Sequence, residues 1–202
     1  MPANRMPRMA SLRLSIMATA TLALGGCISF GEDPPPALLT LTPSVQIAEG
    51  AGPGGEASGV LTVRQPEVPG SLSVTRVPVQ VDPSTIAYLK DAVWVDRPSK
   101  LFQNLLVTTI RERTGRLVLD DVESRAASES VLRGTLREFG YDAGSGSVVV
   151  TYDAIRENGG KLQTRRFTAR VPGIAAEAGP VGIALNDAAN QVAIDVADWI
   201  GR

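Results

Sequence analysis

The chain has 202 residues, with 20 basic and 21 acidic side chains, one cysteine and no histidine. This composition excludes a Ser-His-Asp triad, a Cys-His pair and the usual zinc ligand sets, and the near-neutral balance offers nucleic acid no basic footprint. No GxGxxG leading into a predicted helix and no GxxxxGK[ST] occurs, so nothing favours nucleotide binding. A carboxylate pair or a Ser-Lys pair stays open as enzyme chemistry. We predict a protein that is not an enzyme and that uses no cofactor or metal.

The first 26 residues have the layout of an export signal. Three arginines give it a positive start: Arg5, Arg8 and Arg13. The apolar stretch from Leu14 to Leu24 is shorter than the roughly 20 apolar residues of a membrane-spanning helix, so we expect a cleaved signal and not an anchor. Its removal leaves about 176 residues, enough for one domain with its own core. The mature form then has 17 basic and 21 acidic residues, a net charge of −4.

The single cysteine follows this stretch directly. Leu24, Gly25, Gly26 and Cys27 resemble the bacterial lipobox, which implies a lipidated Cys27, an amino terminus acylated with a fatty acid such as palmitate, and cleavage after residue 26. A free cysteine is more often a buried small hydrophobe, but no core is available between a signal and a proline-rich spacer. Several acyl chains make a stable anchor, because each buried methylene contributes about 0.8 kcal/mol. Ile28 in place of Asp points to the outer membrane under the enterobacterial sorting rule.

Residues 27–36 form a tether, and residues 37–202 form the domain. Three consecutive prolines stiffen the tether as polyproline II. Residues 28–36 span at most roughly 30 Å, so the domain stays near its membrane.

Several short strands are expected in the first half of the domain. Residues 37–47 predict a first strand, and residues 48–59 predict a loop too rich in glycine to hold an element. Residues 59–66 and 71–81 predict two further strands, and Pro78 places the second of these at a sheet edge or a bulge.

The segment from residue 86 to residue 115 carries the sharpest signals. Ile86 to Leu89 and Ala92 to Val95 predict two short strands around a Lys90-Asp91 turn. A helix follows, with Pro98 in its first turn and Gly115 just past its end. Its apolar side chains recur at helical spacing on one face, while Gln103, Asn104, Arg111 and Arg113 fall elsewhere; the apolar set is Leu101, Phe102, Leu105, Leu106 and Ile110. The helix should pack on a sheet by this stripe.

The second half of the domain predicts further strands and a final helix. The strands cover residues 115–121, 131–142 and 147–158, and Asn158-Gly159 turns the chain into residues 161–171. The helix begins at Pro180, and its buried stripe comprises Val181, Leu185, Ala188, Ala189, Val192, Val196 and Trp199. The element order predicts an α+β, two-layer domain, with a largely antiparallel sheet and two amphipathic helices packed on one face.

The lipobox, the proline spacer and four residues before and within the first helix form a known arrangement; the four are Tyr88, Trp94, Asp96 and Pro98. The chain from Leu38 to Ile200 resembles the ABC-type transport auxiliary lipoprotein family, outer-membrane components of MCE-type intermembrane lipid transport systems. The resemblance implies a non-enzymatic accessory subunit on the periplasmic face of the outer membrane of a Gram-negative bacterium. It also implies a partner, the MCE-domain subunit of an ABC transporter. That subunit forms the periplasmic conduit, which docks on this protein at the outer membrane. The glycine-rich insertion at residues 48–59 departs from the family pattern.

Some of these residues have more than one interpretation. Trp94 and Tyr88 form a partner surface or, more commonly for aromatic residues, pack between sheet and helix. Asp96 is expected to cap the helix by accepting first-turn N–H groups. Arg165, Arg166 and Arg170 either meet anionic headgroups or line a solvated strand face.

Two other functions stay open: a lipoprotein that carries lipid in an apolar pocket, and a structural envelope tether. A cavity lined by helix and sheet would favour the carrier, whereas a continuous core favours the accessory subunit or the tether. The sequence leaves open the transported lipid, the direction of transport and the oligomeric state, a homo-oligomer being one alternative.

Overall fold

The computed structural model describes residues 37–45, 59–123 and 130–202. The chain divides into two units, residues 1–34 and 35–202, and all the helices and strands named here belong to the second. The predicted signal, the lipobox with Cys27, and the tether lie outside the described residues, as does the glycine-rich insertion except for Gly59. In the described part of the chain, no helix has both the length and the apolar character needed to cross a membrane.

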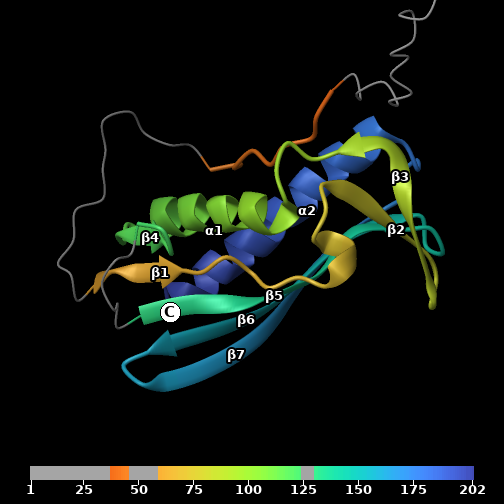
Figure 1. The fold of residues 1–202 in the computed structure, drawn as a ribbon. Helices are drawn as coiled ribbons and strands as arrows, with labels where there is room; N and C mark the ends of the chain where they lie inside the picture. The colour runs from red at the N-terminus through yellow and green to blue at the C-terminus, as the bar shows by residue number, and fades with distance from the viewer. Residues whose placement is uncertain (1–36, 46–58, 124–129) are drawn as a thin grey trace, which may run out of the picture. The chain divides into compact units, whose positions relative to one another are not determined.

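A seven-stranded sheet carries two long helices on one of its faces (Figure 1). The elements are β1 (Leu61–Val63), the 3-10 turn η2 (Gly70–Leu72), β2 (Arg76–Asp82), β3 (Thr85–Val93), α1 (Pro98–Thr114), β4 (Val118–Asp120), β5 (Ser130–Asp142), β6 (Ser147–Asn158), β7 (Lys161–Pro172) and α2 (Ala178–Ile200). The long ladders β5–β6 and β6–β7 and the β2–β3 hairpin are antiparallel. β1 pairs parallel with β4 and β5, and β2 pairs parallel with β5. The predicted α+β class is confirmed.

Strand β5 connects the two hairpins of the sheet. One of its edges pairs with β6 from end to end. The other edge is divided: β1 pairs at Ser130–Leu132, Glu67 forms a bridge to Thr135, and β2 pairs at Tyr141 and Asp142. Gly134 is needed on β5, because a Cβ there would lie 2.1 Å from the carbonyl oxygen of Asp153 on β6.

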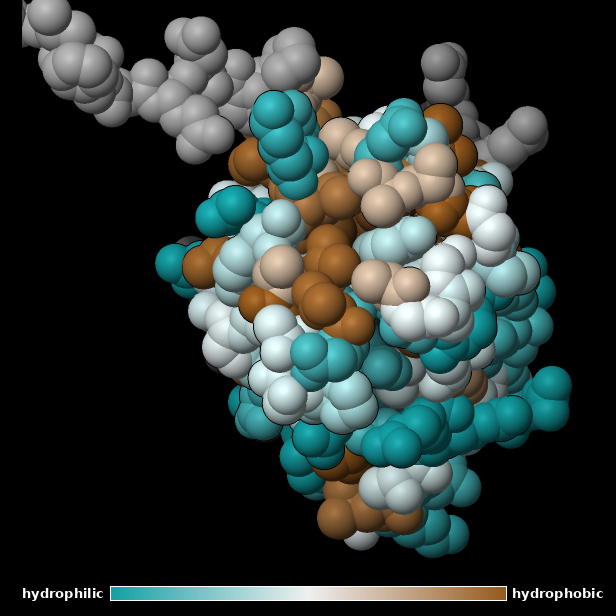
Figure 2. All heavy atoms as spheres, turned by 90° about the vertical axis from the view of Figure 1, so that its right-hand side faces the viewer, coloured by the Kyte–Doolittle hydropathy of each residue, from teal (hydrophilic) through white to brown (hydrophobic). Residues whose placement is uncertain are grey.

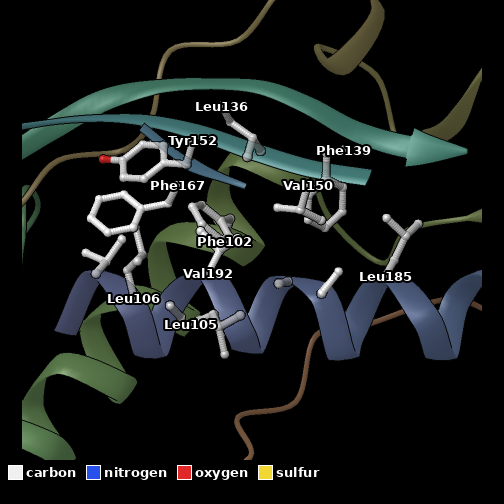
Figure 3. Close-up of a cluster of buried hydrophobic side chains, with 14 of the residues drawn as sticks. Phe102, Leu105, Leu106, Leu136, Phe139, Val150, Tyr152, Phe167, Leu185 and Val192 are labelled. Carbon is white, nitrogen blue, oxygen red and sulfur yellow. The ribbon is translucent and has the colours of Figure 1, made fainter. Parts of the chain in front are cut away.

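The core lies between the sheet and the two helices, and its buried apolar side chains form one continuous cluster. Figure 3 shows side chains from five elements converging there: Phe102, Leu105 and Leu106 of α1, Leu136 and Phe139 of β5, Val150 and Tyr152 of β6, Phe167 of β7, and Leu185 and Val192 of α2. The Phe102 ring centroid lies 5.4 Å from that of Tyr152 and 6.4 Å from that of Phe139. Aromatic pairs at these spacings add to the stability that their burial supplies.

Both predicted helices are confirmed, with small differences. α1 begins at Pro98, and Gly115 closes it at φ 66°, a left-handed cap that glycine adopts without strain. The predicted stripe of α1 is buried, Leu101 only partly. Gln103 differs from the prediction: it is fully buried, and its Nε2 donates to the Val63 carbonyl at 2.9 Å and to Asp121 Oδ1 at 2.5 Å. α2 begins at Ala178, slightly before Pro180, and its predicted stripe is buried except for Trp199, which is partly buried.

Two strand predictions are wrong. The predicted first strand, in so far as it is described, makes a single bridge between Leu39 and Trp94. The two short strands expected around Lys90-Asp91 are one strand, β3, because the ladder with β2 continues past an irregularity there. Asp91 takes a φ of 56°, so this dipeptide is a bulge and not a turn.

Candidate functional site: the β2–β3 hairpin and the pocket beside it

The β2–β3 hairpin ends one side of the sheet, and its turn is held by local hydrogen bonds. The Asp82 carboxylate Oδ1 accepts from the Ser84 N–H and from the Ser84 hydroxyl, both at 2.8 Å. These bonds from Ser84 lower the pKa of Asp82. Gln80 Nε2 donates to the Asp82 carbonyl at 2.5 Å. The tip of the hairpin is therefore a defined structure, which suits a contact surface.

Pro78 stands where the hairpin meets β5. The β2–β3 register shifts between Arg76 and Pro78, so the predicted bulge is present. Gly140 of β5 faces this proline, and a Cβ at Gly140 would lie 2.4 Å from the Pro78 carbonyl oxygen. The close approach of the two backbones requires glycine on β5.

A pocket of about 360 Å³ lies between the hairpin and strands β5 and β6. Its lining residues come from these strands and from the segment around η2: Pro69, Ser71, Leu72, Pro78, Gln80, Ile86, Arg137, Glu138, Phe139, Gly140, Tyr141, Asp142 and Val149. No residue of α1 or α2 lines the pocket, which therefore does not lie between the sheet and the helices, although Leu72, Phe139 and Tyr141 of its lining also belong to the core cluster.

The charged groups at the pocket already have partners. Arg137 Nε contacts Asp153 Oδ2 at 3.0 Å, and the Thr151 hydroxyl donates to Glu138 Oε2 at 2.5 Å. Asp142 accepts from the Ser145 hydroxyl at 2.5 Å, which lowers the pKa of Asp142 together with Arg170. Arg137 and Asp142 are thus paired with opposite charges, whereas Glu138 is bonded to a hydroxyl, so a neutral occupant would meet apolar side chains beside one carboxylate.

The hairpin carries exposed apolar side chains, one of which, Ile86, also lines the pocket. Val81 of β2 and Ile86 of β3 are 46% and 47% exposed. Figure 2 views the molecule from the side of the hairpin and shows apolar residues gathered over the upper part of that face, with mostly hydrophilic residues below them and a smaller apolar group at the lower end. Contiguous apolar surface of this kind is typical of interaction sites.

The motif aromatics take different positions. Trp94 is buried, with its ring centroid 5.3 Å from that of Phe139, so it belongs to the core and not to a partner surface. Tyr88 is half-buried on β3; its hydroxyl donates to the Ser71 carbonyl at 3.4 Å, and the Arg76 guanidinium lies 4.8 Å from its ring centroid. Tyr88 therefore ties the hairpin to the segment that lines the pocket.

Of the other two motif residues, one acts as predicted. Pro98 opens α1 at its first position. The N-cap of α1 is Arg97, not Asp96, and no side chain caps the helix. Asp96 Oδ1 instead accepts from the Arg97 N–H at 2.6 Å. The expected capping role of Asp96 is wrong, because its carboxylate stops one residue short of the first turn.

Sequence reasoning missed a contact between the amino-terminal segment and α2. Asn190 Nδ2 donates to the Thr42 carbonyl at 2.9 Å, and Asn190 Oδ1 accepts from the Ser44 N–H at 2.7 Å. Asn186 Oδ1 accepts from the Thr42 N–H at 2.8 Å. The signal was available: two asparagines four residues apart, next to the apolar stripe of the helix, can pair with an extended backbone. We refer to Asn186, Asn190 and the segment they hold as the asparagine clamp.

The charged strand β7 is solvated, as one of the two interpretations predicts. Arg165, Arg166 and Arg170 are exposed. Arg166 Nε contacts Asp153 Oδ1 at 2.6 Å, and Arg170 Nη1 contacts Asp142 Oδ2 at 3.3 Å. In the described ranges, no group of three or more His, Cys, Asp or Glu side chains could hold a metal ion.

Comparison with known proteins assigns this fold to a family. The model of the ABC-type transport auxiliary lipoprotein component matches residues 39–197. The crystal structure of a Xanthomonas campestris protein is 20% identical, with a TM-score of 0.65 over 81% of this chain and 94% of that one. The crystal structure of an uncharacterized protein is 19% identical, with a TM-score of 0.62 over 71% of this chain and 92% of that one. No curated protein matches the sequence. Since the family model covers most of the chain, this protein belongs to the ABC-type transport auxiliary lipoprotein component family.

Proposed function

We propose that this chain is a non-enzymatic accessory subunit of an MCE-type intermembrane lipid transporter, anchored by Cys27 on the periplasmic face of the outer membrane. The observation that carries the proposal is the family match over residues 39–197, which makes the chain an auxiliary component of an ABC transport system. The MCE-domain partner, the lipid cargo and the outer-membrane position are steps beyond that match. They follow from the family resemblance and from the lipobox Leu24 to Cys27.

The packing of the core supports a docking role over a carrying role. Sheet and helices bury their apolar side chains against each other in one cluster, and Phe102, Phe139 and Tyr152 occupy its middle. A carrier of the kind expected from the sequence would hold its lipid between these two layers. Side chains fill that space here, so the domain is suited to binding a partner on its surface.

The hairpin face is the surface we assign to that partner. Val81 and Ile86 expose apolar area beside the pocket, and the turn at Asp82 holds the hairpin in place. Among the described strands, β3 pairs only with β2. The last residue of its other edge, Val93, is bonded to Leu39, so the part of that edge that begins at Thr85 is the part open to a neighbour. A free edge with exposed apolar side chains is a common site for the addition of a partner strand.

In-cell photocrosslinking tests the proposal. A photoreactive amino acid at Ile86 should capture an MCE-domain protein. The matched control is Leu162 of β7, which is 61% exposed and lies on the opposite edge strand of the sheet. Leu162 should capture much less of that protein. Capture of peptidoglycan fragments or of an unrelated porin at Ile86, with no change when the MCE gene is deleted, would replace the transport role by a structural tether.

The lipid anchor has its own test. Cys27→Ser should leave the precursor uncleaved or soluble, because the residue that carries the lipid is gone. Detergent-phase partitioning of both forms measures this. Equal partitioning of the two forms would contradict the anchor.

A second function, lipid carriage, is favoured by the pocket beside the hairpin, which is lined by apolar side chains such as Leu72, Ile86 and Val149. Lipid that co-purifies with the full chain and is lost in Ile86→Asp would support it. Lipid retained by that variant would be bound elsewhere, and the pocket would then not be the lipid site.

A further inference from the structure

An open hollow of about 600 Å³ lies at the carboxyl ends of both helices, away from the hairpin. It is lined by the last residues of α1 and α2 and by residues that follow these helices, together with Arg156 of β6; the full set is Arg113, Thr114, Arg116, Arg156, Ala197, Asp198, Ile200, Gly201 and Arg202. Four guanidinium groups therefore share the hollow with one acidic side chain, Asp198. We call Arg113, Arg116, Arg156 and Arg202 the basic hollow.

The Asp198 carboxylate is already bonded to Arg113. Asp198 Oδ1 accepts from Arg113 Nε at 3.0 Å and from Arg113 Nη2 at 2.7 Å. Arg116 Nε and Nη2 donate to the Gly59 carbonyl at 3.3 and 3.2 Å, and Arg156 Nη1 donates to the Trp199 carbonyl at 3.3 Å. In residues 37–45, 59–123 and 130–202, neither Arg116 nor Arg156 has a carboxylate within salt-bridge distance. Most of their N–H donors remain available.

The like charges in the hollow act on each other. Burial, and then the positive charge of Arg156, lower the pKa of Arg116, so the two guanidinium groups are close enough to repel. Arg156 Nε is buried and has no hydrogen-bond partner among the described residues. The carboxyl ends of two helices carry partial negative charge, which offsets part of this repulsion but supplies no counter-ion. An anion between the two side chains would neutralise this charge.

We propose that the basic hollow binds a phosphate-class oxyanion, held chiefly by Arg116 and Arg156. The guanidinium fork matches two oxygens of a phosphate at once, and charge-assisted bonds of this kind are about twice as strong as neutral ones. Arg113 stays on Asp198 at the rim, and Arg202 adds positive charge there. Free phosphate and the phosphate of a lipid headgroup offer the same chemistry.

The hollow and the amino-terminal segment lie toward opposite ends of α2. Leu39 packs against Gly182 near the start of this 23-residue helix, whereas Asp198 and Ile200 stand at its end. At about 1.5 Å per residue the helix is roughly 35 Å long. The anion would therefore bind far from the point where the amino-terminal segment joins the domain.

Calorimetric titration of the full chain in non-ionic detergent tests the proposal. The probes are inorganic phosphate, and mixed micelles containing phosphatidylglycerol or, as the uncharged comparison, diacylglycerol. Arg116→Gln with Arg156→Gln should weaken phosphate binding about tenfold or more, because charge-assisted bonds are lost. The control is Arg97→Gln with Arg133→Gln, which removes the same charge from two exposed positions and should leave binding unchanged.

The outcomes separate the two sources of phosphate. Binding of inorganic phosphate that depends on Arg116 and Arg156, without binding to phosphatidylglycerol micelles, identifies a soluble ligand. Binding to these micelles that is lost in the same variant and absent with diacylglycerol identifies a lipid headgroup. Absence of both, or equal loss in the control variant, overturns the proposal. Should circular dichroism show that the glutamine variant is unfolded, Arg116→Lys with Arg156→Lys takes its place, and undiminished phosphate binding by this pair overturns the assignment to the guanidinium forks.

Discussion

The two hairpins at opposite sides of the sheet manage their exposed edges differently. The β6–β7 hairpin runs in unbroken register over twelve residue pairs, from Ser147–Pro172 to Asn158–Lys161. Its outer strand carries arginines that pair with acidic neighbours. The β2–β3 hairpin is shorter and its register shifts twice, and it exposes apolar side chains next to a pocket.

This difference indicates which edge can accept a partner. Charged side chains along an edge strand discourage the addition of another strand, whereas an edge with exposed apolar residues does not. β7 has Arg165, Arg166 and Arg170 along its length, while β3 presents Ile86 and Ala87. The bulge at Asp91 ends the regular part of β3, so the accessible stretch is short. One domain thus combines a protected edge with an open one.

The largest expected loss of stability comes from a substitution on β5, the strand that joins the two hairpins. Phe139 of β5 packs between Trp94 and Phe102, on the strand that joins the two. Phe139→Ala should cost about 3–5 kcal/mol of the free energy of unfolding, through lost burial and the cavity left behind. Urea unfolding of the full chain measures this. Phe139→Leu, which fills most of the space, should lose much less, and equal losses in the two variants would show that the cavity is not the cause.

A smaller loss of stability is expected from a substitution that loosens only the β2–β3 hairpin. Gly140→Ala places a Cβ 2.4 Å from the Pro78 carbonyl, so β2 must move away from β5 at a cost of about 1–3 kcal/mol. Hydrogen exchange should become faster in β2 and β3 and stay unchanged in β6 and β7. Gly70→Ala, where a Cβ meets no atom within 4 Å, is the control. Uniformly faster exchange across both hairpins would contradict the separation.

The smallest loss of stability is expected for a substitution on the β6–β7 hairpin, which carries the paired charges. Arg166 and then Arg137 hold the pKa of Asp153 down at about 2, so this carboxylate stabilises the fold above pH ~4 and loses that contribution as the pH falls toward 2. Asp153→Asn should cost about 1 kcal/mol or less at neutral pH, because the arginines are exposed. The stability gap should close between pH ~4 and ~2 in chemical unfolding curves. Asp187→Asn, at an exposed helix position, should show no gap at any pH, and a gap of equal size there would refute the specific role of Asp153.

Local signals are enough to predict much of this fold. α1 follows from Pro98 and Gly115, which mark its ends, and the turn between β6 and β7 follows from Asn158-Gly159. Features that depend on distant partners are not visible in this way. Gln103 reads as a surface residue until the Val63 carbonyl that it meets is known.

Sequence patterns do not predict segments whose backbone hydrogen bonds are made to side chains or single residues and not to a neighbouring strand. The segment around Leu39 has strand composition, but its backbone pairs with side chains of α2 instead. The basic hollow combines arginines from α1, from the residues after it, from β6 and from the chain after α2, which only the fold brings together. The pocket at the hairpin likewise needs Pro78 and Gly140 to meet across two strands.

The asparagine clamp also determines how much of the amino-terminal segment is held against the domain. If the domain is held at a membrane through its amino-terminal side, a pulling force travels along that segment and first meets Leu39, which is bonded to Val93 and Val95 and seated over Gly182. Tension is then shared between the end of a strand and the side of a helix. Release of residues 37–45 would free nine residues, whose fully extended length is roughly 30 Å at about 3.3 Å each. Asn186 and Asn190 hold the backbone of Thr42 and Ser44 against α2, so the length of free chain before the domain depends on these two side chains.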